Sequence, residues 1–315
     1  NGIIKGGIKV KRPRETRLSL RKHLNDGETV VAPGCYDAIT AAVVQELGFN
    51  AAYMGGWMTG AALGTTEPLL TLLDQVENAR RALRLLDIPL IVDGHTGFGD
   101  PLHIMRTVQE YENAGISAMH IEDQVYPKRV HYYAGKEHIV PLKEHIERLE
   151  YALKARNDEN FMIIARTDAR RAVEGGTIEA VLERVSALSE VGVDAIMPQV
   201  CDVDEMKRVR DVVPDDVPLL AMAGYGSKWG IQETLTWQEI SHLGYKIIIY
   251  PITTIVATIG AALSINKMIK EQGRAPTSDG FVGFEASRYN EVIAKIEEMI
   301  GVDRLCEVER QTVEE

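Results

Sequence analysis

The 315 residues are 45% hydrophobic and 26% charged, a composition that can bury a large core and argues against disorder over most of the chain. A formal net charge of −11 argues against nucleic-acid and anionic-membrane partners, and the apolar runs stop short of the ~20 residues of a membrane span. We therefore expect a small-molecule partner. Three widely spaced cysteines, Cys35, Cys201 and Cys306, suggest neither a zinc site nor a disulfide framework, so we also expect a reducing, cytoplasmic setting.

Residues 1–27 are expected to form a basic N-terminal arm and a first helix. Short apolar or β-branched runs then recur eight times between longer helical patterns, which is typical of βαβ units. The predicted strands are Thr29–Ala32, Ala51–Met54, Pro89–Asp93, Ala118–Glu122, Met162–Arg166, Ala195–Pro198, Pro218–Met222 and Lys246–Tyr250. The helical patterns between them include Leu70–Leu86, Leu102–Ala114, Leu142–Ala155, Ile178–Val191 and Val203–Val213.

Eight such repeats over residues 28–270 predict a closed (β/α)8 TIM barrel, because an open doubly wound sheet usually has fewer strands and a glycine-rich first turn. An apolar helix over Thr253–Ile269 completes this domain. Residues 271–315 are expected to be a C-terminal helical extension, with a break at Gln272–Gly280 and an amphipathic helix at Tyr289–Ile300. Because extra helices must bury an apolar face somewhere, a partner subunit is expected.

Reactive side chains follow most of the predicted strands. In a barrel the C-terminal strand ends converge on one mouth, so these groups are expected to lie together. A single Asp or His in such a place is usually a helix cap or a loop group, but their coincidence at one end indicates an active site. The segments concerned are Cys35–Asp37, Tyr53–Trp57, Asp93–Gly97, His120–Asp123, Arg166–Asp168 and Tyr250–Pro251.

Two acids on adjacent strands, Asp93 and Glu122, supply hard oxygen ligands. With Glu67 or His95 nearby they are expected to hold Mg²⁺ or Mn²⁺, directly or through water. Such a metal would polarise a substrate carbonyl or enolate oxygen. The alternative is structural: Asp93 caps the following turn and Glu122 pairs with a basic residue such as Lys128.

Arg166 leaves an all-apolar strand, so its guanidinium must emerge at the mouth or pair inside it. Its planar fork suits a substrate carboxylate. The alternative is an ion pair with Asp168 or Glu122. The Gly55-Gly56 pair would let backbone N–H groups approach an anion closely.

The connection Gln124–Val140 is long and rich in aromatic and titratable groups, which is typical of a lid over a barrel mouth. Its polar and aromatic residues are Lys128, Arg129, His131, Tyr132, Tyr133, Lys136 and His138.

The blocks PGCYDAITA, YMGGW, VDGHTGFG, AGISAMHIEDQVYPKR, IIARTDA and IIIYP, within Pro33–Lys270, resemble the isocitrate lyase and phosphoenolpyruvate mutase superfamily. The resemblance is closer to its methylisocitrate lyase-like and dimethylmalate lyase-like members. It implies a Mg²⁺-dependent barrel that makes or cleaves a bond next to an enolate carbon. It also implies a homotetramer, a dimer of dimers, with a terminal helix exchanged between subunits.

Carried over by position, the resemblance makes Asp93 the principal metal-site acid, with Glu122 and Glu67 holding metal-bound waters. Arg166 resembles the carboxylate partner of the substrate, and Lys128-Arg129 the start of the mobile catalytic loop. The expected pocket for the 2-oxo or 2-hydroxy acid end consists of Tyr53, Gly55, Gly56 and Trp57.

Four departures from the family pattern bear on the reaction. Val130 stands where the lyases have the cysteine that acts as general acid, and His95 replaces an aspartate. Gln199, expected to contact substrate, stands where methylisocitrate and isocitrate lyases have a glutamate, and Met222 where an asparagine is common. A classical tricarboxylate substrate is therefore not favoured.

These residues predict a carbon–carbon lyase that acts on a small 2-hydroxy di- or tricarboxylate and releases a 2-oxo acid. Tyr132, His131 or another loop group would protonate the enolate. The first alternative is an oxaloacetate-type decarboxylase, which the missing cysteine favours. Phosphonate mutase or hydrolase chemistry and a non-enzymatic binding barrel are the further alternatives.

Overall fold

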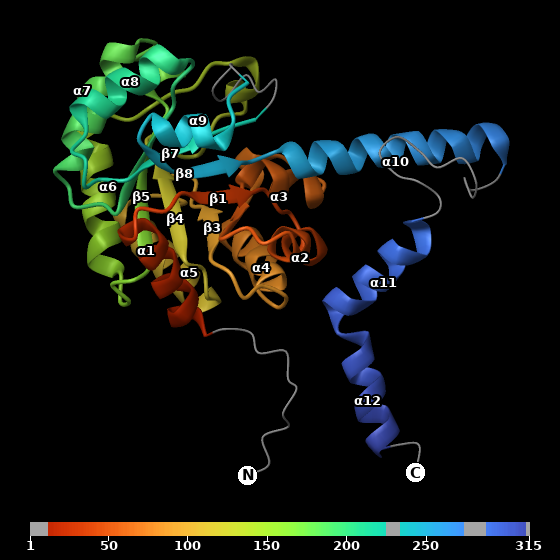
Figure 1. Ribbon diagram of the computed structural model, residues 1–315. Helices are drawn as coiled ribbons and strands as arrows, with labels where there is room; N and C mark the ends of the chain where they lie inside the picture. Colours follow the sequence, from red (N-terminus) through yellow and green to blue (C-terminus); the bar gives the residue numbers. More distant parts are fainter. Residues whose placement is uncertain (1–11, 225–233, 274–287, 313–315) are drawn as a thin grey trace. The chain divides into compact units, whose positions relative to one another are not determined.

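The computed structural model describes residues 12–224, 234–273 and 288–312. Its eight strands are all parallel and lie inside a ring of helices (Figure 1). They are β1 Val30–Pro33, β2 Ala52–Met54, β3 Leu90–Asp93, β4 Ala118–Glu122, β5 Met162–Thr167, β6 Ala195–Pro198, β7 Leu219–Met222 and β8 Tyr245–Tyr250. Each lies at a predicted strand, with ends that differ by one residue at most.

The strand order β1-β8-β7-β6-β5-β4-β3-β2 leaves β1 and β2 as the two ends of the sheet. These ends meet just beyond β1, where the backbone N–H of Cys35 donates to the carbonyl of Tyr53 at 2.8 Å and Gly34 forms a parallel bridge with Tyr53. The sheet is therefore a nearly closed barrel, and the predicted (β/α)8 fold is confirmed.

Nine helices of the described chain accompany the barrel strands. They are α1 Pro13–Asn25, α2 Ala38–Glu46, α3 Gly56–Ala62, α4 Leu72–Ala82, α5 Pro101–Ala114, α6 Leu142–Ala155, α7 Ile178–Ser189, α8 Val203–Val212 and α9 Trp237–His242. The sequence patterns did not indicate α2, α3 or α9, because each of these three helices is too short to display the helical period clearly. Three 3₁₀ segments, η1 Glu67–Leu69, η2 Val130–Ala134 and η3 Ala169–Arg171, lie in the loops after strands.

Helix starts in the barrel are set by polar N-caps. The Asp100 carboxylate accepts from the backbone N–H groups of Leu102 and His103 at the start of α5, and Thr71 and Asp74 form a capping box on α4. These side chains satisfy donors that a helix cannot pair internally. The turn from strand to helix is thereby fixed, and with it the position of the loop in between.

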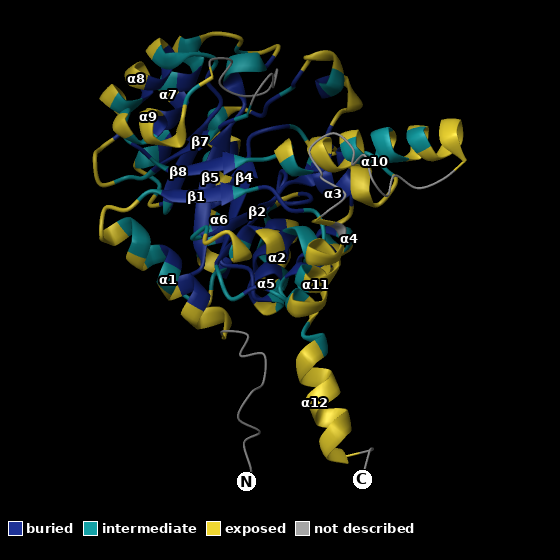
Figure 2. Ribbon diagram, turned by 45° about the vertical axis from the view of Figure 1, so that its right-hand side comes forward, coloured by how far each residue is buried: buried dark blue, intermediate teal, exposed yellow. Residues whose placement is uncertain are grey.

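The core consists of the strands and the inner faces of the helices, which are buried (Figure 2). At the N-terminal ends of the strands, Arg17 of α1 donates to the carbonyls of Ile116 and Glu112 and pairs with Asp158 at 2.9 Å. Because residues 116 and 158 precede β4 and β5, α1 closes this end of the barrel. The opposite end remains for chemistry.

Contacts divide the chain into two compact units, residues 11–253 and a second unit that contains residues 254–315. The second unit contains α10 Thr253–Gln272, α11 Tyr289–Ile300 and α12 Val302–Thr312, so the two helices expected after β8 are present and the charged tail adds a third. No described residue of α12 is buried (Figure 2). Among the described residues, none of the helices has the length and apolar character required to span a membrane.

Candidate active site

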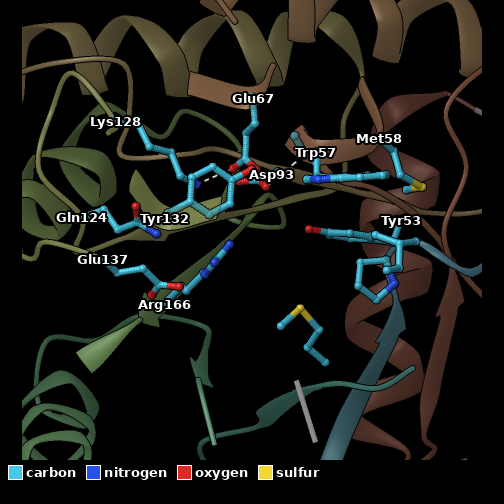
Figure 3. A pocket seen from close by; sticks show the side chains of 15 residues that line it. Tyr53, Trp57, Met58, Glu67, Asp93, Gln124, Lys128, Tyr132, Glu137 and Arg166 are labelled. Carbon is cyan, nitrogen blue, oxygen red and sulfur yellow. Dashed lines mark hydrogen bonds and ion pairs between the residues drawn. The ribbon is translucent and has the colours of Figure 1, made fainter. Parts of the chain in front are cut away.

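The C-terminal strand ends surround a cavity of about 60 Å³ (Figure 3). A single water needs roughly 10–15 Å³ by a comparable measure, so the space suits several waters or a compact acid. The lining residues are Tyr53, Gly55, Gly56, Trp57, Met58, Glu67, Asp93, Gln124, Lys128, Tyr132, Glu137, Arg166, Met222, Pro251 and Ile252. The structure thus brings together most of the residues that the sequence singled out.

Asp93, the last residue of β3, is buried and held by the backbone. Its Oδ2 accepts from the N–H of Gly56 at 3.0 Å, and its Oδ1 accepts from the N–H of His95 at 2.9 Å. Burial opposes ionisation, but the neighbouring basic residues, His120 first among them, outweigh it and lower the pKa of Asp93. The group is therefore an ionised carboxylate with a fixed orientation.

Lys128 lies between two buried glutamates. Its ammonium donates to Glu67 and lies 2.9 Å from Glu122 Oε1. Desolvation disfavours the charged ammonium, but Glu122 and Glu67 outweigh it and raise the pKa of Lys128. The side chain therefore stays cationic and connects the lid to two strand-end loops.

Arg166, on β5, is held on two sides. Its Nε and Nη2 donate to the two carboxylate oxygens of Asp168 at 2.8 and 3.1 Å, and its Nη1 lies 3.1 Å from Glu122 Oε2. The ion pair that the sequence left as an alternative is thus present. The guanidinium still lines the cavity, so pairing and substrate binding are compatible.

Glu122 carries the clearest sign of an additional ligand. Burial raises its pKa to about 7, although Lys128 and Arg166 act in the opposite direction. Both of its carboxylate oxygens are buried without a hydrogen-bond donor of acceptable geometry. Acceptors of this kind are normally satisfied by protein, ordered water or an ion.

Acids outnumber fixed cations at this mouth. The charged residues that meet here are Glu67, Asp93, Glu122, Asp168, Lys128 and Arg166. Among the described residues, no three His, Cys, Asp or Glu side chains are close enough to enclose an ion by themselves. The excess of acidic oxygens is the kind of surroundings in which a hydrated divalent cation can be held.

Tyr53 of β2 lies across the cavity from Arg166 (Figure 3). Its hydroxyl lies 2.9 Å from Nε2 of His120, and the two rings stack with centroids 5.8 Å apart. Burial lowers the pKa of His120 to about 4, although the negative charge of Asp93 acts in the opposite direction. The imidazole is therefore neutral, and its Nε2 can accept a hydrogen bond from the tyrosine hydroxyl.

His95 follows β3 in the left-handed region, with φ of 51°. Its Nδ1 lies 3.8 Å from Glu67 Oε1, and its Nε2 is buried without a hydrogen-bond partner. A Cβ atom on Gly56 would lie 2.4 Å from His95 Cε1, so only glycine fits there. Gly56 thus lets its own N–H approach Asp93 while His95 packs against it.

The lid is closed over the cavity. Its base is a short antiparallel pairing in which Val125 N–H donates to His138 O at 2.9 Å. From η2, the Tyr132 hydroxyl donates to Glu67 Oε2 at 2.8 Å, and the Lys128 ammonium lies 4.9 Å from the centre of its ring. Arg129 and His131 are exposed and do not line the cavity.

Gln199 is 3% exposed and lies just after β6. Its backbone N–H donates to Thr167 O at 3.0 Å, and its side-chain oxygen has no hydrogen-bond partner. The residue is not part of the cavity lining, whereas Met222 is.

The sequence interpretation assigned no catalytic or binding role to four residues at the site, although Asp168 was expected as a possible ion-pair partner of Arg166: His120, Gln124, Glu137 and Asp168. Strand alternation could have found His120, because it lies two residues before Glu122 and therefore faces the same side of β4. Gln124 donates to Asp168 at 2.5 Å and so fixes the carboxylate that holds Arg166. Glu137 has no such signal, since it belongs to a loop.

Comparisons with known proteins agree with this arrangement. The model of the family described as phosphoenolpyruvate phosphomutase matches residues 20–270. The chain is 35% identical to 2,3-dimethylmalate lyase of Eubacterium barkeri, over 93% of this chain and 97% of that protein. It is also 35% identical to 2-methylisocitrate lyase of Aeropyrum pernix, over 81% and 80%.

Solved structures give the same result. A crystal structure of 2,3-dimethylmalate lyase matches with a TM-score of 0.79 and 26% identity, covering 94% of this chain and 98% of that one. Oxaloacetate acetylhydrolase with 3,3-difluorooxalacetate matches with a TM-score of 0.81 and 28% identity, covering 96% and 98%. The predicted superfamily is confirmed, and the named lyases agree with the predicted carbon–carbon lyase class. The chain belongs to the phosphoenolpyruvate phosphomutase family.

Proposed function

We propose that this protein is a Mg²⁺-dependent carbon–carbon lyase that cleaves a small 2-hydroxy dicarboxylate into a 2-oxo acid and a second carboxylate. One observation carries the proposal: the buried acids Asp93 and Glu67 line one cavity with Lys128 and Arg166, and both of these cations pair with a third buried acid, Glu122. Such a set both attracts a hydrated cation and stabilises negative charge that develops on a substrate oxygen.

The metal site would use Asp93, with Glu122 and Glu67 contributing through water and His95 alongside them. The two oxygens of Glu122 form ion pairs with Lys128 and Arg166 but accept no hydrogen bond of acceptable geometry, which supports this assignment. When bound, Mg²⁺ supplies electrostatic stabilisation of a negatively charged oxygen. A phosphonopyruvate hydrolase structure, 25% identical with a TM-score of 0.79, contains Mg²⁺ and oxalate, which favours this ion.

The cavity lining supports a substrate with one charged end and one apolar end. Polar groups lie on the side of Asp93 and Arg166, whereas Trp57, Met58 and Met222 give the lining an apolar part. A third carboxylate would face this apolar part without a fixed cation, at a large desolvation cost. An alkyl-substituted dicarboxylate of the dimethylmalate type is therefore favoured over a tricarboxylate.

The reaction begins at the 2-hydroxyl group. In our proposal the substrate hydroxyl donates to the Tyr53 oxygen while Tyr53 passes its own proton to His120. The Asp93 carboxylate, 3.6 Å from Nδ1 of His120, would stabilise the imidazolium that forms. The backbone N–H groups after β2 and the Arg166 guanidinium orient the carboxylate of the 2-hydroxy acid end. The C2–C3 bond then breaks, its electron pair remains on the departing carboxylate as an enolate, and a group on the closed lid protonates that carbon. Lid closure excludes water until this transfer is complete.

A substrate panel tests the proposal. Dimethylmalate, methylisocitrate, citramalate and oxaloacetate would be incubated with the protein with and without Mg²⁺, and 2-oxo acid release would be measured. We expect the largest kcat/KM for dimethylmalate and loss of activity on chelation or in Asp93→Asn, with exposed Asp100→Asn as the matched control. Activity on the panel that survives both chelation and Asp93→Asn would rule out the metal-assisted mechanism.

A 2-oxo acid decarboxylase is the second candidate, because Val130 stands at the lyase cysteine position and is 54% exposed. Decarboxylation of oxaloacetate would need Arg166 and the metal but no base for a hydroxyl proton. The oxaloacetate arm of the panel separates the two functions. Release of CO₂ and pyruvate, without cleavage of any 2-hydroxy acid, would favour the decarboxylase.

We further propose that the protein is a homotetramer of the cytoplasm with its C-terminal helices exchanged between subunits. The apolar residues of α11, which include Ile293 and Ile296, are about 40% exposed, as an unpaired interface would be. The three cysteines are free thiols, which supports a reducing compartment.

A further inference from the structure

A buried carboxyl group of the lid faces the cavity without a role in the mechanism above. Glu137 is 2% exposed, and its side chain lines the cavity. Its Oε2 is buried without a hydrogen-bond partner. Figure 3 shows the carboxyl group beside Arg166 and across the cavity from Tyr53. A substrate held between these two residues would therefore present one face to Glu137.

The backbone at Glu137 is anchored independently of the tip of the lid. Its carbonyl accepts from the N–H of Val173 at 2.8 Å, and it forms a parallel bridge with Ala172. Three residues further on, the N–H of Val140 donates to Asp123 O at 2.8 Å. Glu137 thus belongs to the fixed base of the lid, so its carboxyl group keeps its place while η2 opens and closes.

The surroundings of Glu137 favour the neutral carboxylic acid. Burial is the largest effect, and Asp168 and Glu122 add negative charge, whereas Arg166 and Arg171 oppose them. The net result raises the pKa of Glu137 to about 8. At neutral pH the group therefore carries a proton, and the nearby Arg166 would stabilise the carboxylate that remains after the proton leaves.

The other lid groups are less suited to giving up a proton. The Tyr132 hydroxyl already donates to Glu67, and burial with the Glu67 charge raises the pKa of Tyr132. The Lys128 ammonium is engaged by Glu67 and Glu122. Val130 has no titratable group. The enolate carbon formed by bond cleavage still needs a proton donor inside the closed cavity.

We propose that Glu137 is the general acid that protonates the departing enolate. This inference rests on the proposed lyase function. When the C2–C3 bond breaks, its electron pair stays on C3 of the carboxylate enolate. The Glu137 O–H bond then breaks, a C3–H bond forms, and Glu137 is left as a carboxylate. The Tyr53–His120 pair gains the proton of the 2-hydroxyl group, and Glu137 loses the proton that C3 receives, so the protons balance. Once the lid opens, exchange with water returns the Tyr53–His120 pair and Glu137 to their starting protonation states.

The test compares Glu137→Gln with the wild type on the best substrate of the panel. Glutamine keeps the size of the side chain but cannot donate a proton of comparable acidity, so kcat should fall by about 10²–10⁴-fold with little change in KM. Glu137→Asp should recover part of that loss. The matched control is Glu147→Gln on α6, an exposed glutamate outside the cavity, which should keep wild-type kinetics.

The pH profile separates a proton donor from a structural role. The donor must be protonated, so the wild-type kcat should fall as pH rises through about 8, and Glu137→Gln should lack this alkaline limb. Infrared difference spectra between acidic and alkaline pH should show, besides the C=O band of Glu122, the band of a second buried protonated carboxyl group, and Glu137→Gln should lack that second band. Both readouts are insensitive to a simple loss of packing.

The outcomes distinguish the two proposals. A wild type that cleaves a panel substrate, with Glu137→Gln retaining its kcat and its alkaline limb, would overturn the role of Glu137 and leave the lyase function intact. Absence of the second infrared band from the wild type would overturn the role as well. If the wild type cleaves no 2-hydroxy acid of the panel, the lyase function fails, and the role of Glu137 fails with it.

Discussion

At the scale of single residues, the structure of the site depends on buried charged side chains that form ion pairs with one another. Lys128 is the clearest case, since its ammonium serves Glu67 and Glu122 at once and is 8% exposed. Removing one member of such a group leaves the others without a partner in a medium that solvates them poorly. Stability and activity are therefore coupled at this position.

Replacement of Lys128 by Met should reduce the unfolding free energy by about 3–5 kcal/mol and abolish substrate turnover, because two glutamates lose their cation. The pKa of Glu122 lies at about 7 in the folded protein, above its ordinary value of 4.5, so protonation of this group stabilises the fold at low pH. That contribution is lost as pH rises through the folded pKa. Loss of Lys128 raises this pKa further, so the destabilisation should be larger at about pH 8 than at about pH 6.

Denaturant unfolding of Lys128→Met and the wild type at the two pH values measures this difference. Lys136→Met, an exposed lysine of the same lid, is the control and should unfold like the wild type. Equal stability of Lys128→Met and the wild type at both pH values would contradict the buried charge cluster.

At the scale of elements, the lid combines a fixed base with a tip that reaches the site. The base is paired at Gln124 and Ile139, and the tip contacts the barrel through the hydrogen bond from Tyr132 to Glu67. Loops that seal a barrel mouth are held shut by a few such contacts and must release them for products to leave. The stability of the closed lid therefore depends on single hydrogen bonds.

Tyr132→Phe should weaken lid closure, because it removes the hydroxyl that donates to Glu67 at 2.8 Å. A hydrogen bond to a charged group contributes about 1.5–3 kcal/mol, so KM should rise roughly 10-fold or more. Limited proteolysis would follow cleavage within residues 129–136, which should become faster. Tyr126→Phe, at a half-exposed tyrosine of the same loop, should cleave at the wild-type rate. Unchanged proteolysis of Tyr132→Phe would show that this contact does not hold the lid.

At the scale of the whole molecule, the barrel is complete by residue 253, whereas the unit that contains α10 to α12 exposes much of its apolar surface. The exposed apolar residues there include Val256, Ile259, Leu263, Ile293, Ile296, Leu305 and Val308. Apolar patches of this kind in a folded chain usually mark an interface. An assembly of several copies would cover them.

The double variant Ile293→Asp, Ile296→Asp should dissociate the predicted tetramer, because two charges would enter an apolar interface. Light scattering with size-exclusion chromatography measures the mass, with Glu297→Gln on the same helix as a control that should assemble normally. A wild-type protein that elutes as a monomer would contradict the predicted assembly.

The sequence by itself determined the barrel. Each strand is a short apolar run, and the parallel arrangement follows because helical patterns separate most of these runs and provide crossovers. The C-terminal ends of such strands converge, so the sequence predicts Asp93, Glu122 and Arg166 at one mouth of the barrel. Local sequence patterns are sufficient here, because the spacing of apolar residues within each element and the alternation of strands and helices along the chain identify the fold.

Only the tertiary structure decided how these groups pair. The placement of Lys128 between Glu67 and Glu122, and of Arg166 between Glu122 and Asp168, depends on a lid and on loops whose conformation has no periodic signature. The same holds for Glu137, which reaches the cavity from a loop. Its chemistry follows from burial and neighbouring charge, and these arise only when segments distant in sequence enclose one small space.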